Sequence, residues 1–153
     1  MREIKCRGKR IDNGAWVEGY YCKHIKRRLC PVGDKLKEDD VEHIIFFDDF
    51  ADWNMPQKLR GADVLPETVG QYTGMNDKNG TEIYEGDIIK TKKYGKIIGH
   101  SNVADYDTFK IVYELAVFRL ENMHRGFNLV GNNNDFEVIG NIHDNPELPE
   151  VQI

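Results

Sequence analysis

Cysteine and histidine side chains are the first groups in this sequence that could do chemistry. Cys22, His24 and Cys30 could supply three metal ligands, but a structural zinc site needs four, usually from paired knuckles. The nearest further candidates, Cys6 and His43, lie at no recognised ligand spacing. A cysteine nucleophile would need a base and an orienting group beside it, and no pairing stands out. We therefore expect no metal site, no cofactor and unpaired thiols.

Carboxylates form two further sets near expected turns and loops: Glu82, Glu85 and Asp87 in the first, and Asp48, Asp49 and Asp52 in the second. Paired carboxylates perform acid–base catalysis only where a cleft raises their pKa values. Charged residues are mostly exposed, so solvated turn and loop faces are the simpler interpretation. The sequence thus predicts a protein that is not an enzyme.

Two basic clusters suggest a nucleic-acid partner. Residues 23–28 and residues 90–96 each carry four lysines or arginines. Small barrels bind single strands with a basic groove and stacking aromatics. The net charge of −5 and the pI of about 5.5 argue against such a partner, and the clusters could instead pair with the acidic segment 34–52 of this or a neighbouring subunit. If the clusters share one face, the contact residues would be Lys23, Arg27, Lys92, Lys93 and Tyr94.

Aromatic residues around position 50 suggest a protein partner. Phe46, Phe47, Phe50 and Trp53 exceed what a tiny barrel easily hides, and surplus apolar surface often marks an interface. We expect a homo-oligomer, or contact with a different protein. The spacing of these aromatics resembles a helix, but residues 44–47 could form a short strand, and periodicity does not separate the two for so short a run.

Composition sets the broad class of the protein. The 153 residues suffice for one ordinary domain or two very small ones, and 40% of them are apolar. No segment approaches the roughly 20 apolar residues that span a membrane, and the basic N-terminus precedes no apolar run of the signal-peptide kind. An odd number of cysteines forms no disulfide framework. We expect a cytoplasmic protein with free buried thiols and no membrane partner.

The N-terminal part predicts a hairpin followed by a charged loop. Residues 2–7 alternate with the period of a strand that has one buried face. Asn13-Gly14 is a strong hairpin signal, and residues 16–25 would form the partner strand. Residues 31–42 are polar and highly charged, so we expect a loop there.

The chain from residue 68 onward predicts many short strands. Seven candidates rich in Val, Ile, Tyr, Phe and Thr, which favour pleated surfaces, are separated by Gly, Asn, Asp or Lys. Short strands at this spacing are typical of a small barrel or sandwich. The candidates cover residues 68–74, 86–92, 95–103, 108–114, 116–122, 126–131 and 136–142.

Two tight turns are expected around the first of these strands. In the sequence DKNG at residues 77–80, Asp favours the first turn position and Gly tolerates a positive φ at the exit. A Gly-Asp step at residues 86–87 predicts a second turn, in which the aspartate would accept hydrogen bonds from nearby amides. The residues assigned to turns are Gly74, Asp77, Asn79, Gly80, Gly86 and Asp87.

Three blocks of sequence carry a family resemblance. Residues 66–90, "PETVGQYTGMNDKNGTEIYEGDIIK", resemble the signature of the YopX-like proteins of bacteriophages and prophages. Residues 2–8, "REIKCRG", are similar to the family's usual opening, and residues 136–148, "FEVIGNIHDNPEL", to its usual close. The blocks stand in the family's order.

The resemblance implies an architecture more than an activity. It implies a mainly β protein in which an SH3-like small β-barrel at residues 66–153 carries an added N-terminal hairpin and loop region at residues 1–65. It supplies no catalytic residue and no particular biochemical role. We therefore expect a non-catalytic protein-interaction or assembly module in a bacterial host cell, whose partner is a second copy of itself or a host or phage protein. The alternative is a single-stranded nucleic-acid-binding protein that uses the two basic clusters.

Overall fold

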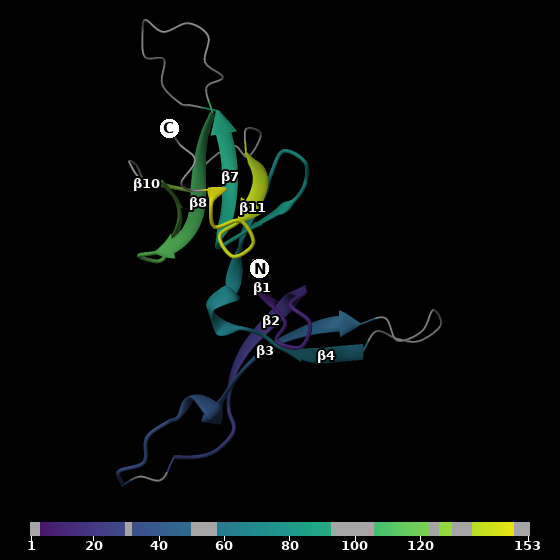
Figure 1. Ribbon diagram of the computed structural model, residues 1–153, viewed down its shortest axis with the longest axis vertical. Coiled ribbons are helices and arrows are strands. Elements are labelled where there is room, and N and C mark those ends of the chain that lie inside the picture. Colours follow the sequence, from purple (N-terminus) through teal and green to yellow (C-terminus); the bar gives the residue numbers. More distant parts are fainter. Residues whose placement is uncertain are drawn as a thin grey trace, which may run out of the picture. The chain divides into compact units, whose positions relative to one another are not determined.

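The protein is mainly β. The computed structural model describes residues 4–29, 32–49, 58–92, 106–122, 126–129 and 136–148. Its strands form two antiparallel sheets, accompanied by two short 3-10 helices (Figure 1). Among these described residues, no helix is long and apolar enough to cross a lipid bilayer. The expected β class is therefore confirmed.

The chain divides into two compact units, residues 1–71 and residues 72–153. We call them the N-terminal unit and the C-terminal unit. The domain boundary expected after residue 65 stays a prediction.

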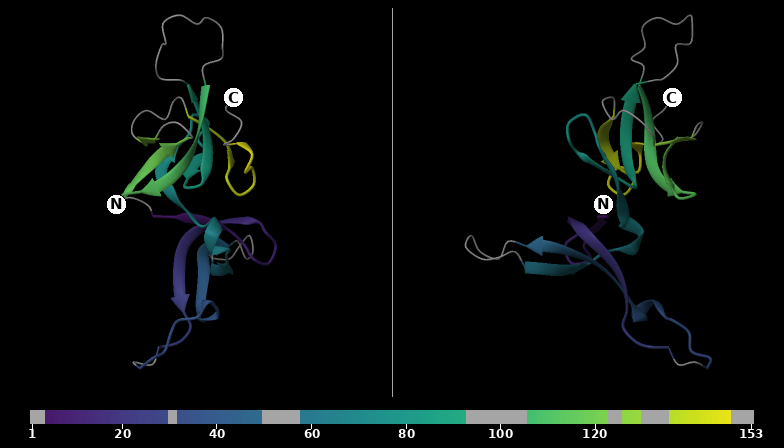
Figure 2. Two further views of the ribbon diagram at one scale, coloured as in Figure 1. Left: turned by 60° about the vertical axis from the view of Figure 1, so that its left-hand side comes forward. Right: turned by 180° about the vertical axis from the view of Figure 1, so that it is seen from behind.

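Six elements form most of the N-terminal unit: β1 (Cys6–Lys9), β2 (Trp16–Ile25), η1 (Glu38–Asp40), β3 (Val41–Asp49), β4 (Lys58–Asp63) and η2 (Pro66–Thr68). The four strands pair in chain order, each antiparallel to the next, and Figure 2 shows β2 and β3 side by side. The expected β1–β2 hairpin is confirmed, with Gly14 at a φ of 70° in its turn. Its first strand covers residues 6–9 rather than the expected residues 2–7, and residues 4 and 5 lie outside it. An isolated bridge also joins Arg10 to Val64.

The aromatic segment that could have been helix or strand is the strand β3. It pairs with β2 along one edge and with β4 along the other, and these two ladders satisfy backbone groups that a helix would have to satisfy internally. The same pairing shortens the charged loop expected at residues 31–42. Residues 38–40 form η1, and Val41 and Glu42 already belong to β3.

One face of the N-terminal sheet packs into a small core. Val17, Ile45, Ala62 and Val64 are buried together, and Phe47 packs against them. Ile45 is completely buried. This core comes from β2, β3, β4 and the residue after β4, so its contacts hold together strands that are far apart in the sequence.

The C-terminal unit contains most of β5 (Gly70–Asn76), then β6 (Glu82–Tyr84), β7 (Asp87–Lys92), β8 (Tyr106–Glu114), β9 (Val117–Glu121), β10 (Gly126–Asn128) and β11 (Glu137–Asn141). Five of these strands form a sheet in the order β10-β9-β8-β7-β11. Its core is Ile83, Ile89, Phe109, Ile111, Phe118, Leu120 and Phe136.

Closure of this sheet into an SH3-like barrel stays a prediction. In the described part of the unit, no ladder joins β10 to β11. The strand expected at residues 95–103 lies outside the described residues.

The turn between β5 and β6 is built around the side chain of Asp77. Its Oδ1 accepts hydrogen bonds from the Asn79 amide at 2.8 Å and the Thr81 amide at 2.9 Å. Its Oδ2 accepts one from the Val138 amide of β11 at 3.0 Å. Gly80 leaves the turn at a φ of 86°. The turn forms as expected, and the carboxylate also fastens it to β11.

Of the other expected turn residues, Gly86 and Asp87 lie at a turn and Gly74 does not. Gly86 has a φ of 83°, and Asp87 Oδ2 accepts a hydrogen bond from the Tyr84 amide at 2.8 Å, as expected for an aspartate at a turn. Gly74 does not lie in a turn. It lies inside β5 at a φ of 85°, at the point where the register against β6 shifts. Glycine allows this backbone conformation at an irregular position of the strand.

Candidate functional site

The face of the N-terminal sheet opposite the core carries an apolar patch. Side chains alternate between the two faces of a strand, and directly paired residues share a face. Tyr20 lies opposite Phe46, and Phe46 lies opposite Gly61, so these three positions turn away from Ile45. By the same register the patch that we call the apolar outer face comprises Tyr20, Ile44, Phe46, Leu59 and Gly61. Cys22, Asp48 and Asp63 lie beside this patch on the same side of the sheet, because each is paired with one of its residues.

The apolar outer face is open to solvent at both sides. Tyr20 on β2 is 59% exposed and Leu59 on β4 is 63% exposed, while Ile44 and Phe46 between them are half-buried. A β carbon on Gly61 would lie 3.0 Å from Ile44 and 3.2 Å from Phe46. Both side chains therefore lean over Gly61, and the apolar surface continues across three strands.

The aromatic residues predicted to form an interface lie in different environments. Phe46 is part of the apolar outer face, whereas Phe47, one residue along the strand, packs against the core. Phe50 and Trp53 lie outside the described residues. Strand alternation separates Phe46 from Phe47, which the helical spacing had grouped together.

The cysteines are only partly as expected. Neither Cys6 nor Cys22 forms a disulfide. Cys22 is exposed rather than buried, because it lies opposite Ile44 on the outward side of the sheet. Cys30 is outside the described residues. Within the described ranges, no three His, Cys, Asp or Glu side chains gather as metal ligands.

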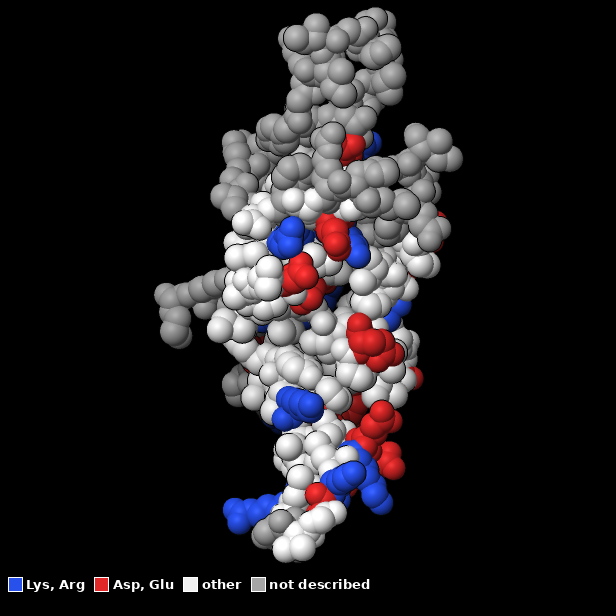
Figure 3. Space-filling model, turned by 90° about the vertical axis from the view of Figure 1, so that its left-hand side faces the viewer, with Lys and Arg blue, Asp and Glu red and all other residues white. Residues whose placement is uncertain are grey.

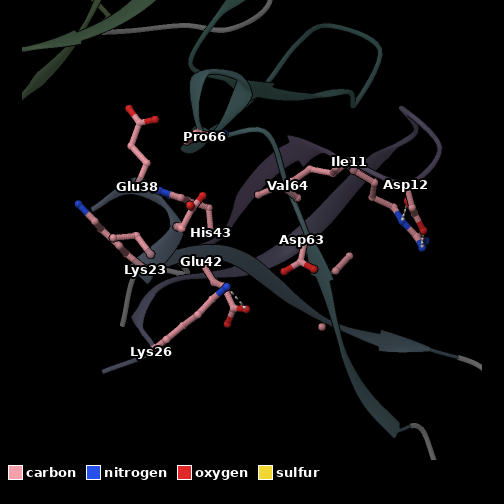
Figure 4. Close-up of a pocket in the computed structure, with 15 residues that line it drawn as sticks. Ile11, Asp12, Lys23, Lys26, Glu38, Glu42, His43, Asp63, Val64 and Pro66 are labelled. Carbon is pink, nitrogen blue, oxygen red and sulfur yellow. Dashed lines mark hydrogen bonds and ion pairs between the residues drawn. The ribbon is translucent and has the colours of Figure 1, made fainter. Parts of the chain in front are cut away.

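An open groove of about 1050 Å³ lies on the N-terminal unit (Figure 4). Its lining comes from the turn after β1, from η1 and from the ends of β2, β3 and β4. Ile11, Val41, Val64 and Pro66 give it an apolar part. In the view of Figure 4, Glu38 and Lys23 lie on one side and Ile11 and Asp12 on the other.

Ion pairs neutralise part of the charged lining of the groove. Arg10 binds Asp12, with its Nη2 2.6 Å from Oδ2, and Lys26 Nζ lies 3.1 Å from Glu42 Oε1. Among the described residues, no partner neutralises the remaining four charged side chains. These are Lys23, Glu38, Asp39 and Asp63, so the groove keeps three carboxylates against one ammonium group.

His43 lines the groove in a fixed orientation. The Tyr21 hydroxyl lies 2.6 Å from His43 Nδ1, and the two rings stack with their centroids 6.0 Å apart. Burial raises the pKa of the Tyr21 hydroxyl, with smaller contributions from Cys6 and Cys22. Lys23 lies directly opposite His43 on β2, so this side of the groove is fixed by the β2–β3 ladder.

The first basic cluster pairs with acidic residues of its own chain. Arg27 lies 2.6 Å from Asp34 and 2.9 Å from Asp40. Hydrogen bonds to these two carboxylates raise the pKa of the Arg27 guanidinium, and Arg27 lowers the pKa of Asp40. Figure 3 shows basic and acidic side chains touching at its lower end. This pairing is the one that the acidic segment 34–52 led us to expect, and Lys23 stays outside it.

The second basic cluster is described only at its start. Lys90 and Lys92 belong to β7, and Lys93 and Tyr94 lie outside the described residues. The two clusters belong to different compact units. Their use in one nucleic-acid groove therefore stays a prediction.

The architecture and these surfaces can be compared with known proteins. The model of the YopX protein family matches residues 7–150. The chain belongs to the YopX family. This membership confirms the resemblance carried by residues 66–90 and the two terminal blocks. No curated protein matches this YopX-family chain.

A solved structure gives the same fold. The YopX-family chain is similar to the crystal structure of protein EF1440 from Enterococcus faecalis, with 24% sequence identity and a TM-score of 0.53. The alignment covers 97% of this chain and 99% of that chain. At this identity the likeness shows the fold alone, so the functional argument depends on the surfaces of this chain.

Sequence reasoning missed the groove and most of the apolar outer face. Tyr20 and Leu59 belong to strands that flank β3, and their place beside Phe46 depends on the strand register. The sequence did contain one signal for Tyr20. Side chains along residues 16–25 alternate between two faces, and Tyr20 falls on the face opposite the buried Val17. The groove unites residues 10 to 66, and no local pattern predicts it.

Proposed function

We propose that this YopX-family chain is a non-catalytic protein-interaction and assembly module that acts in the cytoplasm of a bacterium carrying a phage or prophage. The single observation that carries the proposal is the apolar outer face. An antiparallel sheet with one face on a core usually presents polar side chains on its other face. Here the second face carries Asp48 and Asp63 but also presents Tyr20, Phe46 and Leu59. An exposed group of large apolar side chains on such a face is the pattern of a surface covered by a partner.

A second copy of the chain is the partner that this face fits best. Tyr20, Phe46 and Leu59 carry no charge, so the same three side chains of another copy are complementary to them in chemistry. Asp48 and Asp63 lie beside them on this face and would stay at the border of such a contact. A two-fold dimer uses one patch on both subunits, and two sheets packed face to face bury their facing side chains as in a β-sandwich. We propose that the C-terminal unit, as an SH3-like small barrel, does not take part in this contact.

Sedimentation velocity tests the proposal with two matched double variants. Tyr20→Ser with Leu59→Ser removes the two most exposed anchors of the face. Tyr113→Ser with Leu115→Ser removes the same two residue types from the C-terminal unit, where they are 48% and 84% exposed. We expect the wild type and the second variant to dimerise and the first variant to sediment as a monomer.

The expected size of the effect follows from the symmetry. A dimer loses four anchors in the first variant, each contributing about 1 kcal/mol or more. Dimerisation should then weaken roughly a thousandfold, because 1.4 kcal/mol is tenfold in affinity. If the wild type stays monomeric up to about 1 mM, its dimer dissociation constant exceeds this value and the affinity is negligible. That result would refute self-assembly.

The alternative function is single-stranded nucleic-acid binding through Lys23, Arg27 and the cluster at residues 90–96. The two carboxylates on Arg27 compete with any phosphate for its guanidinium. Salt dependence separates the two functions, because phosphate contacts lose affinity linearly with the logarithm of salt concentration. A labelled oligonucleotide that does not bind at low salt would remove the alternative.

A further inference from the structure

The groove on the N-terminal unit has the features of a peptide site rather than of a site for one compact ligand. It is open, it is about as large as the upper range of small-molecule pockets, and its lining spans the turn after β1, η1 and three strand ends. An extended segment covers about 3.3 Å per residue. Such a segment could contact the apolar part at Ile11 and Val41 together with the charged side chains around it.

The charge left in the groove selects the kind of segment. The pairs Arg10–Asp12 and Lys26–Glu42 are satisfied within the chain. The remaining carboxylates of Glu38, Asp39 and Asp63 exceed the one remaining ammonium group, that of Lys23. Complementary charge across an interface sets partner choice and association rate, so a basic segment is favoured and an acidic one is repelled.

We propose that this groove binds an extended segment of a partner protein in which lysine or arginine alternates with apolar residues. The inference rests on the proposed function and deepens it, because it names the chemistry of a partner at a second surface. The apolar outer face and the groove share Gly61, but their other residues differ, so each could take its own partner. One face would join copies of the chain and the other would take the basic segment.

The probe for this site is a fluorescein-labelled octapeptide of alternating lysine and valine, with a glutamate-for-lysine peptide as its control. Fluorescence anisotropy at physiological salt reports the binding. We expect the wild type to bind the lysine peptide and not the glutamate peptide. A wild type that binds neither peptide, or binds both equally well, would overturn the proposal.

Two triple variants separate the groove from the acidity of the whole protein. Glu38→Gln, Asp39→Asn and Asp63→Asn remove the three groove carboxylates. Asp48→Asn, Glu85→Gln and Glu147→Gln remove the same charge elsewhere. The groove variant should bind roughly tenfold more weakly, as expected for three exposed charge pairs, and the control variant should bind like the wild type. Equal loss in the two variants would mean that net charge alone attracts the peptide, and would overturn the site.

A variant that binds the peptide more tightly gives further evidence, because a variant that failed to fold would not gain affinity. Lys23→Gln removes the one unpaired ammonium group of the groove, so the lysine peptide should bind about twofold more tightly. Unchanged or weaker binding would contradict the charge argument.

The two proposals fail in different ways. The variant Tyr20→Ser with Leu59→Ser should lose self-association and keep the lysine peptide. If the wild type dimerises but does not bind the peptide, the groove proposal alone fails. If it binds the peptide as a monomer, self-assembly through the apolar outer face alone fails.

Discussion

The substitution Asp77→Asn tests whether one buried carboxylate holds the β5–β6 turn to β11. Asp77 is only 4% exposed, and three backbone amides donate to it, those of Asn79, Thr81 and Val138. Asparagine has nearly the same shape. It keeps one acceptor oxygen for the amides of the turn, but places an NH₂ group against the Val138 amide.

The expected cost is worked from these three hydrogen bonds. The lost Val138 bond leaves a buried donor unsatisfied, at about 1–3 kcal/mol. The two bonds that remain change from charged to neutral acceptors and weaken by roughly 0.5–1 kcal/mol each. The free energy of unfolding should fall by about 2–5 kcal/mol, a large part of the roughly 5–15 kcal/mol of an ordinary domain.

The pH dependence of stability supplies a second readout. Burial alone would raise the pKa of Asp77, but hydrogen bonds from Val138, Thr81 and Asn79 outweigh it and lower that pKa. A carboxyl with a lowered folded-state pKa stabilises the fold above its unfolded pKa of about 3.9, and this contribution is lost as the pH falls through the lower folded value. The stability gap between wild type and Asp77→Asn should therefore narrow below about pH 4.

Urea unfolding at a series of pH values measures both effects. Glu147→Gln is the control, because Glu147 is an exposed carboxylate of the same unit, and we expect it to change the unfolding free energy by less than about 0.5 kcal/mol. If Asp77→Asn costs no more than this control at pH 7, or if its cost is the same at pH 7 and pH 3, the reasoning is wrong.

Three further predictions concern the core, a turn and the nucleic-acid alternative. Ile45→Ala should cost about 2–5 kcal/mol in urea unfolding, because the completely buried side chain leaves a cavity; a cost below about 1 kcal/mol would mean that the core is loose. Gly86→Ala should cost about 1–2 kcal/mol, since its φ of 83° is left-handed, and an unchanged unfolding midpoint would contradict this. The wild type should leave the anisotropy of a labelled oligothymidine unchanged at low salt. The double variant Asp34→Asn with Asp40→Asn frees Arg27 from its two carboxylates. If this variant raises the anisotropy of the oligothymidine in a salt-sensitive way, the nucleic-acid alternative is favoured.

Local chemistry explains which parts of the fold could be predicted from the sequence. The turn at residues 77–80 was predictable because its aspartate and glycine act within four residues of each other. The contact of Asp77 with Val138 was not, since it joins positions 61 residues apart, and no local pattern records such a partner. In the same way, the sequence predicted short strands and the pairing of β1 with β2 across a local turn, but not the pairing of β2 with β3 or of β3 with β4.

The candidate site shows the same limit. Phe46 and Phe47 are adjacent in a strand, so one faces outward and the other faces the core, whereas the helical spacing placed them on one surface. Arg27 was correctly considered as a pairing partner for the acidic segment, because opposite charges lie within about a dozen residues along the chain. The neighbours of Phe46 on β2 and β4 required the register of two ladders.

Hydroxyl-radical footprinting across a concentration series tests the central claim most directly, because it reports the exposure of individual side chains in solution. If the apolar outer face joins two copies, Tyr20 and Leu59 should react in dilute solution and become protected as the concentration rises, while Tyr113 and Leu115 react equally throughout. Reaction of Tyr20 and Leu59 that stays constant while the protein self-associates would contradict the account, because the subunits would then meet through another surface.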